Sequence, residues 1–167
     1  MKNKNSLLPI GERLSDDLKD NQHMTEHPMF CLQVLHREIG YDPVYSDNEC
    51  WHDTETMDVV YDDDSETQRK DLGFNPVEDF WGFDETPEGW DGPFGYKDSW
   101  RTVMVSLTQK GIDDYMLNDG HNVKRIAFRG KTRTYVETFR RCDEMIEIRN
   151  ALIEMADKND LSIHENR

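Results

Sequence analysis

The distribution of charge is the feature that most constrains the fold of this chain of 167 residues. Residues 42–98 contain 18 of the 35 acidic residues and only three basic ones, Arg69, Lys70 and Lys97, which leaves a net charge of −15 on this segment. Residues 1–41 and 99–167 together hold 17 acids and 17 bases, which cancel. The whole net charge therefore lies in one insert-like block, here called the acidic tract. Such a block favours fast association with basic partners, an effect that weakens as salt is added.

Composition limits the class of protein. Hydrophobic residues make up 35% of the chain, below the usual 45–50% or so, yet four Trp, six Tyr and seven Phe argue against disorder throughout. No apolar run approaches the roughly 18 residues that cross a bilayer, and the apolar patch within residues 1–10 is too short for a signal peptide. The cysteines Cys31, Cys50 and Cys142 are odd in number and widely spaced, which predicts no disulfide framework and a cytoplasmic location.

Alternating apolar residues predict strands on both sides of the acidic tract. Phe30–Ile39 alternates over its first half, and the stretch from Trp100 (WRTVMVSLT) is rich in β-branched residues. Two more strands are predicted at Val123–Phe128 and Thr132–Phe139, around the turn Arg129-Gly130-Lys131.

Helical spacing predicts three helices. A weak one is expected within residues 1–27, and a second runs from an N-cap at Thr108 to Asn118, with Gly120 in its stop. The third spans 143–158, where apolar residues recur at helical spacing behind two acids.

Glycine and proline interrupt the second half of the acidic tract. Gly73–Gly95 (GFNPVEDFWGFDETPEGWDGPFG) contains five glycines and three prolines among its aromatic and acidic residues, which predicts an ordered loop. The expected organisation is a polar leader at 1–28, a single α+β domain at 29–158 and a frayed tail at 159–167. The domain is expected to be a small antiparallel sheet packed with two or three helices, with the acidic tract as a loop-rich insert.

Metal binding is an alternative for the densest acidic run. Asp62, Asp63 and Asp64 offer three carboxylates to a hard cation, but no EF-hand spacing follows, so a solvated acidic loop is favoured. His23 and His27, four residues apart, lack a second ligand pair with convincing spacing. No metal or other cofactor is predicted.

Catalytic chemistry has no clear signature in the chain. Nothing orients a histidine toward any of the three cysteines, and each acid has several like neighbours, so no acid–base pair stands out. The chain is therefore not expected to be an enzyme.

A basic cluster lies outside the acidic tract. It comprises Lys124, Arg125, Arg129, Lys131, Arg133, Arg140 and Arg141. These bases could bind phosphate, or they could neutralise the acidic tract or form a solvated hairpin; the net charge of −15 favours the second interpretation.

Three segments resemble an uncharacterised family of phage and prophage proteins. Met29–Asp53 (MFCLQVLHREIGYDPVYSDNECWHD) is similar to the family's opening block. Gly95–Val123 (GYKDSWRTVMVSLTQKGIDDYMLNDGHNV) and Thr134–Leu152 (TYVETFRRCDEMIEIRNAL) follow its order of tryptophan strand, T-x-K-G helix, GHN turn, tyrosine strand and closing EM/EW…IR helix. The leader and the aromatic part of the acidic tract lie outside the pattern, and Asp119 departs from it. The resemblance implies a small phage protein in the cytoplasm of an infected host cell, and it implies no mechanism.

Charge and resemblance together predict a non-catalytic phage protein that inhibits a basic, nucleic-acid-binding host or defence protein. Its carboxylates would imitate duplex DNA, as an anti-restriction or anti-CRISPR protein does; duplex DNA carries one phosphate per about 1.7 Å of axis. The alternatives are an acidic phage accessory protein without inhibitory activity and the metal-binding protein described above. The partner is expected to be a protein rather than DNA or a membrane, and homodimerisation is left open. The predicted partner-binding residues are Asp62, Asp63, Asp64, Glu66, Glu78, Asp79, Trp81, Phe83, Asp84, Glu85, Glu88, Trp90 and Asp91.

Overall fold

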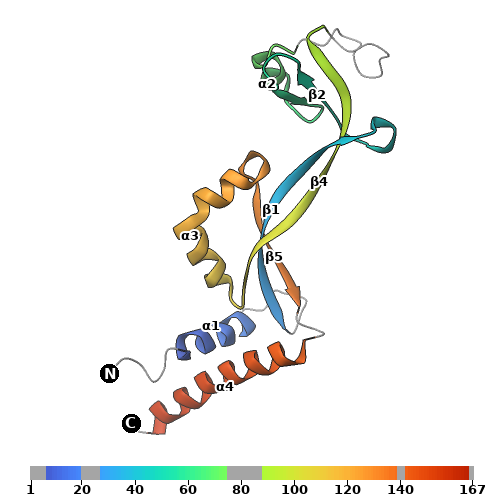
Figure 1. Cartoon of the computed structure of the whole chain (residues 1–167). Helices are drawn as coiled ribbons and strands as arrows, with labels where there is room; N and C mark the ends of the chain where they lie inside the picture. Colours follow the sequence, from blue (N-terminus) through green and yellow to red (C-terminus); the bar gives the residue numbers. More distant parts are fainter. Residues whose placement is uncertain (1–6, 20–26, 75–87, 139–141, 166–167) are drawn as a thin grey trace. The chain divides into compact units, whose positions relative to one another are not determined.

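The computed structural model describes residues 7–19, 27–74, 88–138 and 142–165 and has an α+β fold, as predicted (Figure 1). The strands form one five-stranded antiparallel sheet in the order β3-β2-β4-β1-β5. They are β1 (Pro28–Tyr41), β2 (Glu49–Asp53), β3 (Val59–Tyr61), β4 (Trp90–Ser106) and β5 (Thr132–Thr138). The helices are α1 (Leu8–Lys19), α2 (Glu66–Asp71), α3 (Gln109–Ile126) and α4 (Asp143–Glu165), with 3-10 turns η1 (Pro43–Tyr45) and η2 (Phe128–Gly130).

The chain divides into two compact units. Residues 1–35 and 100–167 form the scaffold unit, and residues 36–99 form the acidic unit. The acidic unit has 19 acids and four bases, a net charge of −15, whereas the scaffold unit has 16 of each. The division by contacts therefore coincides with the division by charge.

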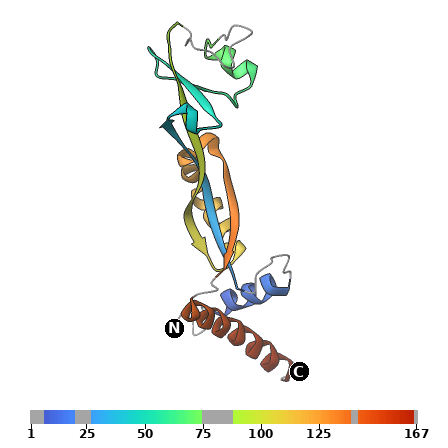
Figure 2. The ribbon, with the colours of Figure 1, turned by 90° about the vertical axis from the view of Figure 1, so that its right-hand side faces the viewer.

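The scaffold unit is built around one side of β1. Phe30, Leu32 and Val34 alternate along the strand and pack against Ile112 and Val123 of α3. Helix α3 lies along the strands on this side (Figures 1 and 2). Strand β1 lies between β4 and β5 in the sheet and pairs antiparallel with β5, in a register from Pro28↔Thr138 to Val34↔Thr132.

Helix α3 is longer than the sequence pattern predicts. Thr108 is its N-cap, as predicted, and its side chain accepts a hydrogen bond from the Gly111 amide. The predicted strand at 123–128 is wrong, because residues up to Ile126 continue the helix, and Gly120 lies buried inside it rather than at its end. The free energy that Val123 and Ala127 gain by burial in the core is larger than the free energy that Val123 costs through its weak helix propensity.

Helix α1 lies in the segment predicted to be a polar leader, where a weak helix was expected. It packs against α4, and Leu14 is fully buried (Figure 2). The two helices approach so closely that a Cβ on Gly11 would lie 2.0 Å from the carbonyl oxygen of Leu152. Helix α4 runs to Glu165, past the predicted end at Lys158 and into the tail that was expected to fray.

The acidic unit has its own small aromatic core. Trp51, Val60 and Phe74 are buried, and the half-buried Trp90 packs on Phe74 with ring centroids 4.8 Å apart. Part of the tract predicted as a loop is regular structure: from Trp90 onward the chain is strand β4, which pairs with β2. The pairing has a register shift between Cys50 and His52. Residues 75–87 of the predicted loop lie outside the described residues.

Candidate functional site: the acidic unit

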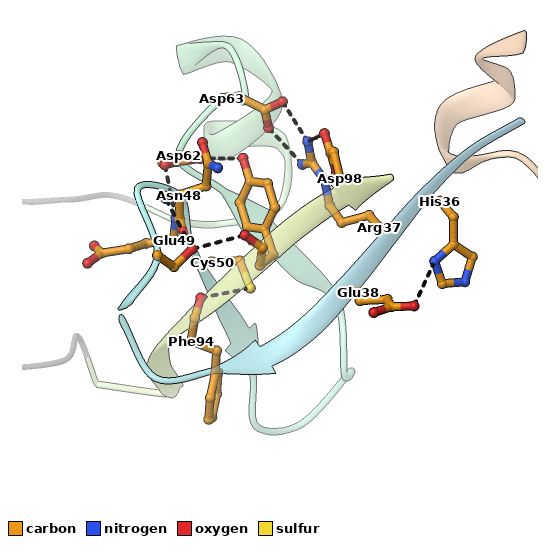
Figure 3. Close-up of polar contacts among 12 residues, drawn as sticks. His36, Arg37, Glu38, Asn48, Glu49, Cys50, Asp62, Asp63, Phe94 and Asp98 are labelled. Atoms are coloured by element: carbon orange, nitrogen blue, oxygen red, sulfur yellow. Dashed lines mark hydrogen bonds and ion pairs between the residues drawn. The ribbon is translucent and has the colours of Figure 1, made fainter. Parts of the chain in front are cut away.

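Arg37 is the organising cation of the acidic unit. Its side chain is only 3% exposed and makes forked hydrogen bonds to two carboxylates (Figure 3). Nε and Nη2 donate to Asp98 at 2.7 Å each, while Nη1 and Nη2 donate to Asp63 at 3.0 Å each. Forked geometry of this kind gives the strongest ion pairs that arginine forms.

Two tyrosine rings enclose the Arg37 guanidinium. Its Cζ lies 3.8 Å from the ring centroid of Tyr96 and 4.5 Å from that of Tyr61. Burial would lower the pKa of Arg37, but the hydrogen bonds to Asp98 and Asp63 outweigh it and raise the pKa. Burial also raises the pKa of Tyr96, and so does its hydrogen bond to Asp62, which accepts from the Tyr96 hydroxyl at 2.6 Å. The Arg37 guanidinium therefore stays charged, and the Tyr96 phenol stays neutral, at physiological pH.

The three aspartates of the predicted metal cluster serve different partners. Asp62 also accepts from the Glu49 amide at 3.0 Å, Asp63 faces Arg37, and Asp64 accepts from the Tyr61 amide at 2.8 Å. No group of three or more His, Cys, Asp or Glu is placed to hold a metal ion within the described residues.

Asp64, one of the predicted partner-binding residues, is buried. The residue is 6% exposed, and its carboxylate closes the turn after β3. A buried carboxylate that already accepts a backbone hydrogen bond has little left to offer a partner.

The remaining predicted contact residues have different roles. Glu66 begins α2 and pairs with Lys70, which lowers the pKa of Glu66. Glu88 and Asp91 are exposed, whereas Trp90 is half-buried and packs against the aromatic core. The other six predicted contacts, Glu78, Asp79, Trp81, Phe83, Asp84 and Glu85, lie outside the described residues.

Part of the acidic surface is free of internal partners. In the described part of the acidic unit, the side-chain carboxylates of five exposed acids make no hydrogen bond or ion pair with another described residue: Asp47, Glu55, Asp71, Glu88 and Asp91. Asp42 and Asp53 instead cap turns through backbone amides, which lowers the pKa of Asp53. The unpaired carboxylates are available for an external cation.

Sequence reasoning missed two features of this site. Arg37 lies in β1 just beyond the residues where apolar and polar side chains alternate. A basic residue there, shortly before a segment with so many acids, was the sequence signal for a buried ion pair. Val44 and Tyr45 in η1 are the other omission, since both are large and highly exposed. Their signal was the apolar pair that follows Asp42-Pro43 in an otherwise polar stretch.

Two of the three cysteines, Cys31 and Cys50, are buried and poorly suited to act as nucleophiles. Cys50 is fully buried beside β4, and its thiol donates to the Phe94 carbonyl at 3.4 Å. Burial raises the pKa of Cys50 to about 12. Cys31 is also buried, as its place in an apolar strand predicted, and burial followed by the charge of Glu137 raises its pKa. Neither thiol has the lowered pKa that a catalytic cysteine needs.

The basic cluster belongs to the scaffold unit. Arg133 stacks over Trp100, with Cζ 4.2 Å from the ring centroid, and donates to Gln33 at 2.9 Å. Lys124, Arg125 and Lys131 are exposed and form no ion pair with another described residue. Arg140 and Arg141 lie outside the described residues.

No family model, curated protein or solved structure matches the chain. Within the described residues, no helix combines the length and apolar character needed to cross a membrane.

Proposed function

We propose that the acidic unit is a docking surface for a basic, nucleic-acid-binding protein of a bacterial host or its defence systems. By occupying the surface that would otherwise bind nucleic acid, the chain inhibits that protein. The single observation that supports this proposal most strongly is the concentration of the entire net charge of −15 in one compact unit. A surface of one sign attracts partners of the opposite sign and repels nucleic acids and anionic membranes.

The internal contacts of the unit fit this role. Arg37 joins Asp63 and Asp98 and so limits repulsion inside the unit. Asp47, Glu55, Glu88 and Asp91 remain exposed and unpaired in the described structure. A carboxylate that has no internal partner gives up no internal ion pair when it meets an external lysine or arginine, so these four are the acids best suited to contact the partner.

Charge neutralisation at matched positions tests the proposal. The first variant combines Asp47→Asn, Glu55→Gln, Glu88→Gln and Asp91→Asn in the acidic unit. The control combines Glu12→Gln, Glu137→Gln, Glu144→Gln and Glu147→Gln, all exposed acids of the scaffold unit. Both variants change the net charge by the same amount, so they separate the location of charge from its total.

Bacterial cell extract is passed over each immobilised chain, and bound proteins are eluted with duplex DNA. We expect the parent and the control to retain the same DNA-displaceable basic protein and the first variant to lose it. Binding should weaken steeply between about 50 and 200 mM salt. Equal retention by both variants, or no protein that duplex DNA displaces from the parent, would show the proposal to be wrong.

A further inference from the structure

Two adjacent apolar side chains stand out on the acidic unit. Val44 is 84% exposed and Tyr45 is 79% exposed, both in the 3-10 turn η1 between β1 and β2. Single exposed apolar residues are common on protein surfaces and need no explanation. Here two neighbours are exposed together, and the acids Asp42 and Asp47 on either side of them are exposed as well.

The backbone of this turn is held in place. The Asp42 carboxylate accepts from the Val44 amide at 2.9 Å, and the Asp42 carbonyl accepts from the Tyr45 amide at 2.9 Å. The Ser46 amide donates to the Pro43 carbonyl at 3.1 Å, and Pro43 fixes its own φ. The apolar pair is therefore presented by an ordered turn, which lowers the entropy that a binding event would remove.

Strand β4 anchors the base of the turn. The Ser46 hydroxyl lies 2.9 Å from the Tyr96 carbonyl and 2.8 Å from the Asn48 carbonyl, both of which are hydrogen-bond acceptors. Gly95 permits this contact, because a Cβ at position 95 would lie 2.7 Å from the Cβ of Ser46. Tyr96 also stacks on Arg37, so the turn is connected to the ion-pair network described above.

We propose that Val44 and Tyr45 are the apolar anchor of the docking surface and insert into an apolar pocket rimmed by lysine and arginine on the basic partner. This proposal rests on the proposed function and adds the residues that carry affinity. Charge complementarity identifies the occupant: Asp42 and Asp47 flank the anchor within a unit of net charge −15, so a pocket with a basic rim fits it. Tyrosine is enriched among residues that dominate binding energy, and surrounding charges set rate and specificity.

Photo-crosslinking from position 45 locates the anchor. p-Benzoylphenylalanine replaces Tyr45 in the full chain, and the control places it at Leu117 of the scaffold unit, which is also 84% exposed. Each chain is irradiated in bacterial extract, and the adducts are identified by mass spectrometry. The expected result is an adduct with a basic protein from position 45 that duplex DNA suppresses, and no such adduct from position 117.

Affinity measurements with that purified protein complete the test. The variant Val44→Ser/Tyr45→Ser should raise Kd about tenfold or more and leave the salt dependence unchanged. The fourfold acidic-unit variant described above should instead reduce the salt dependence. Far-UV circular dichroism and urea denaturation establish that each variant keeps the parent fold, as substitutions of exposed side chains should.

The outcomes separate the two proposals. If the charge variant weakens binding and the Val44/Tyr45 variant stays within about twofold of the parent Kd, the anchor is wrong and the docking function stands. If the parent chain yields no DNA-suppressible adduct and retains no DNA-displaceable protein, both proposals are wrong. An adduct between two copies of this chain would assign the anchor to self-association and overturn the choice of a basic partner.

Discussion

Arg37 illustrates how one buried cation makes a dense group of carboxylates compatible with folding. Asp63 and Asp98 come from distant parts of the sequence and would repel each other if they met without it. The guanidinium bridges them with two forked pairs and fills the space between two tyrosine rings. Lysine cannot reproduce this arrangement, since its ammonium group is neither planar nor forked.

Replacing Arg37 should therefore destabilise the acidic unit. We expect Arg37→Met to lower the free energy of unfolding by about 2–3 kcal/mol, because hydrogen bonds to charged groups are lost and two carboxylates stay unpaired. Arg37→Lys should recover only part of this loss. Urea denaturation followed by tryptophan fluorescence measures both, with the exposed Arg125→Met as a control that should change stability by less than about 0.5 kcal/mol. A loss for Arg37→Met no larger than that of the control would contradict the role assigned to Arg37.

Two buried protons predict a loss of stability at alkaline pH. Burial raises the pKa of Cys50 from its ordinary 9.0 to about 12, and burial also raises the pKa of Tyr96 above its ordinary 10.0. Because the folded state holds these protons more tightly than the unfolded state, their contribution is complete below about pH 9. It is lost progressively as the pH rises from about 9 through about 12.

Denaturation midpoints measured between pH 7 and pH 11 test this sign. The midpoint should fall above about pH 9, and the fall should be shallower in Cys50→Ala, which lacks the thiol but starts from a lower stability at pH 7. A midpoint that rises with pH across this interval would be inconsistent with the buried thiol and phenol.

The secondary-structure elements show which parts of the fold the sequence predicts. Alternation in the first half of β1 and the β-branched run in β4 identified both central strands, and helical spacing located the starts of α3 and α4. The end of α3 was missed, because Val123 has a weak helix propensity and only its burial against β1 keeps it helical. Local patterns carry no information about such tertiary packing.

The candidate site was harder to predict than the fold. The charge of the acidic tract was evident, but which acids are paired depends on Arg37 and Tyr96, which approach one another only in the folded chain. Trp90 was predicted as a partner-binding residue, and in the folded chain it is half-buried because β4 brings its ring against Phe74. Composition identified the kind of surface, and tertiary contacts determined its residues.

The contact between α1 and α4 predicts opposite effects for two glycine substitutions in helices. Gly11→Ala should destabilise by about 1–3 kcal/mol, because the new Cβ meets a backbone carbonyl that has no room to move. Gly120→Ala should be neutral or stabilise by up to about 1 kcal/mol, because its new Cβ lies 3.4 Å from the flexible end of Met116 and alanine favours the helix. Thermal denaturation of both variants provides the comparison. Equal effects would mean that α1 does not pack against α4 at Gly11.

At the scale of the whole molecule, the acidic unit interrupts a hairpin of the scaffold. Within the scaffold unit Gln33 donates to Thr102 at 3.2 Å, and within the acidic unit Arg37 donates to Asp98 at 2.7 Å. Strands β1 and β4 are neighbours in the sheet, and the scaffold unit ends at Leu35 and resumes at Trp100. The two ends of the acidic unit are therefore neighbours in the sheet.

A chain without the acidic unit should still fold. Replacing residues 36–99 with Asn-Gly closes Leu35 to Trp100 through a two-residue hairpin and keeps the core of β1, α3 and β5. We expect far-UV circular dichroism with the helical signal retained and a cooperative thermal transition. Retention on an anion-exchange column should be lost, because the remaining residues carry 16 acids and 16 bases. Loss of the helical signal would show that the scaffold depends on the acidic unit.

The neighbouring ends of the acidic unit also bear on how such a protein can evolve. When an insert begins and ends at neighbouring positions of a domain, recombination can replace it without altering the packing of that domain. The segment between residues 36 and 99 is then free to diversify under selection from its binding target, while the flanking sequence is conserved for folding alone. Among related chains, we expect substitution rates to change sharply at Leu35 and Trp100.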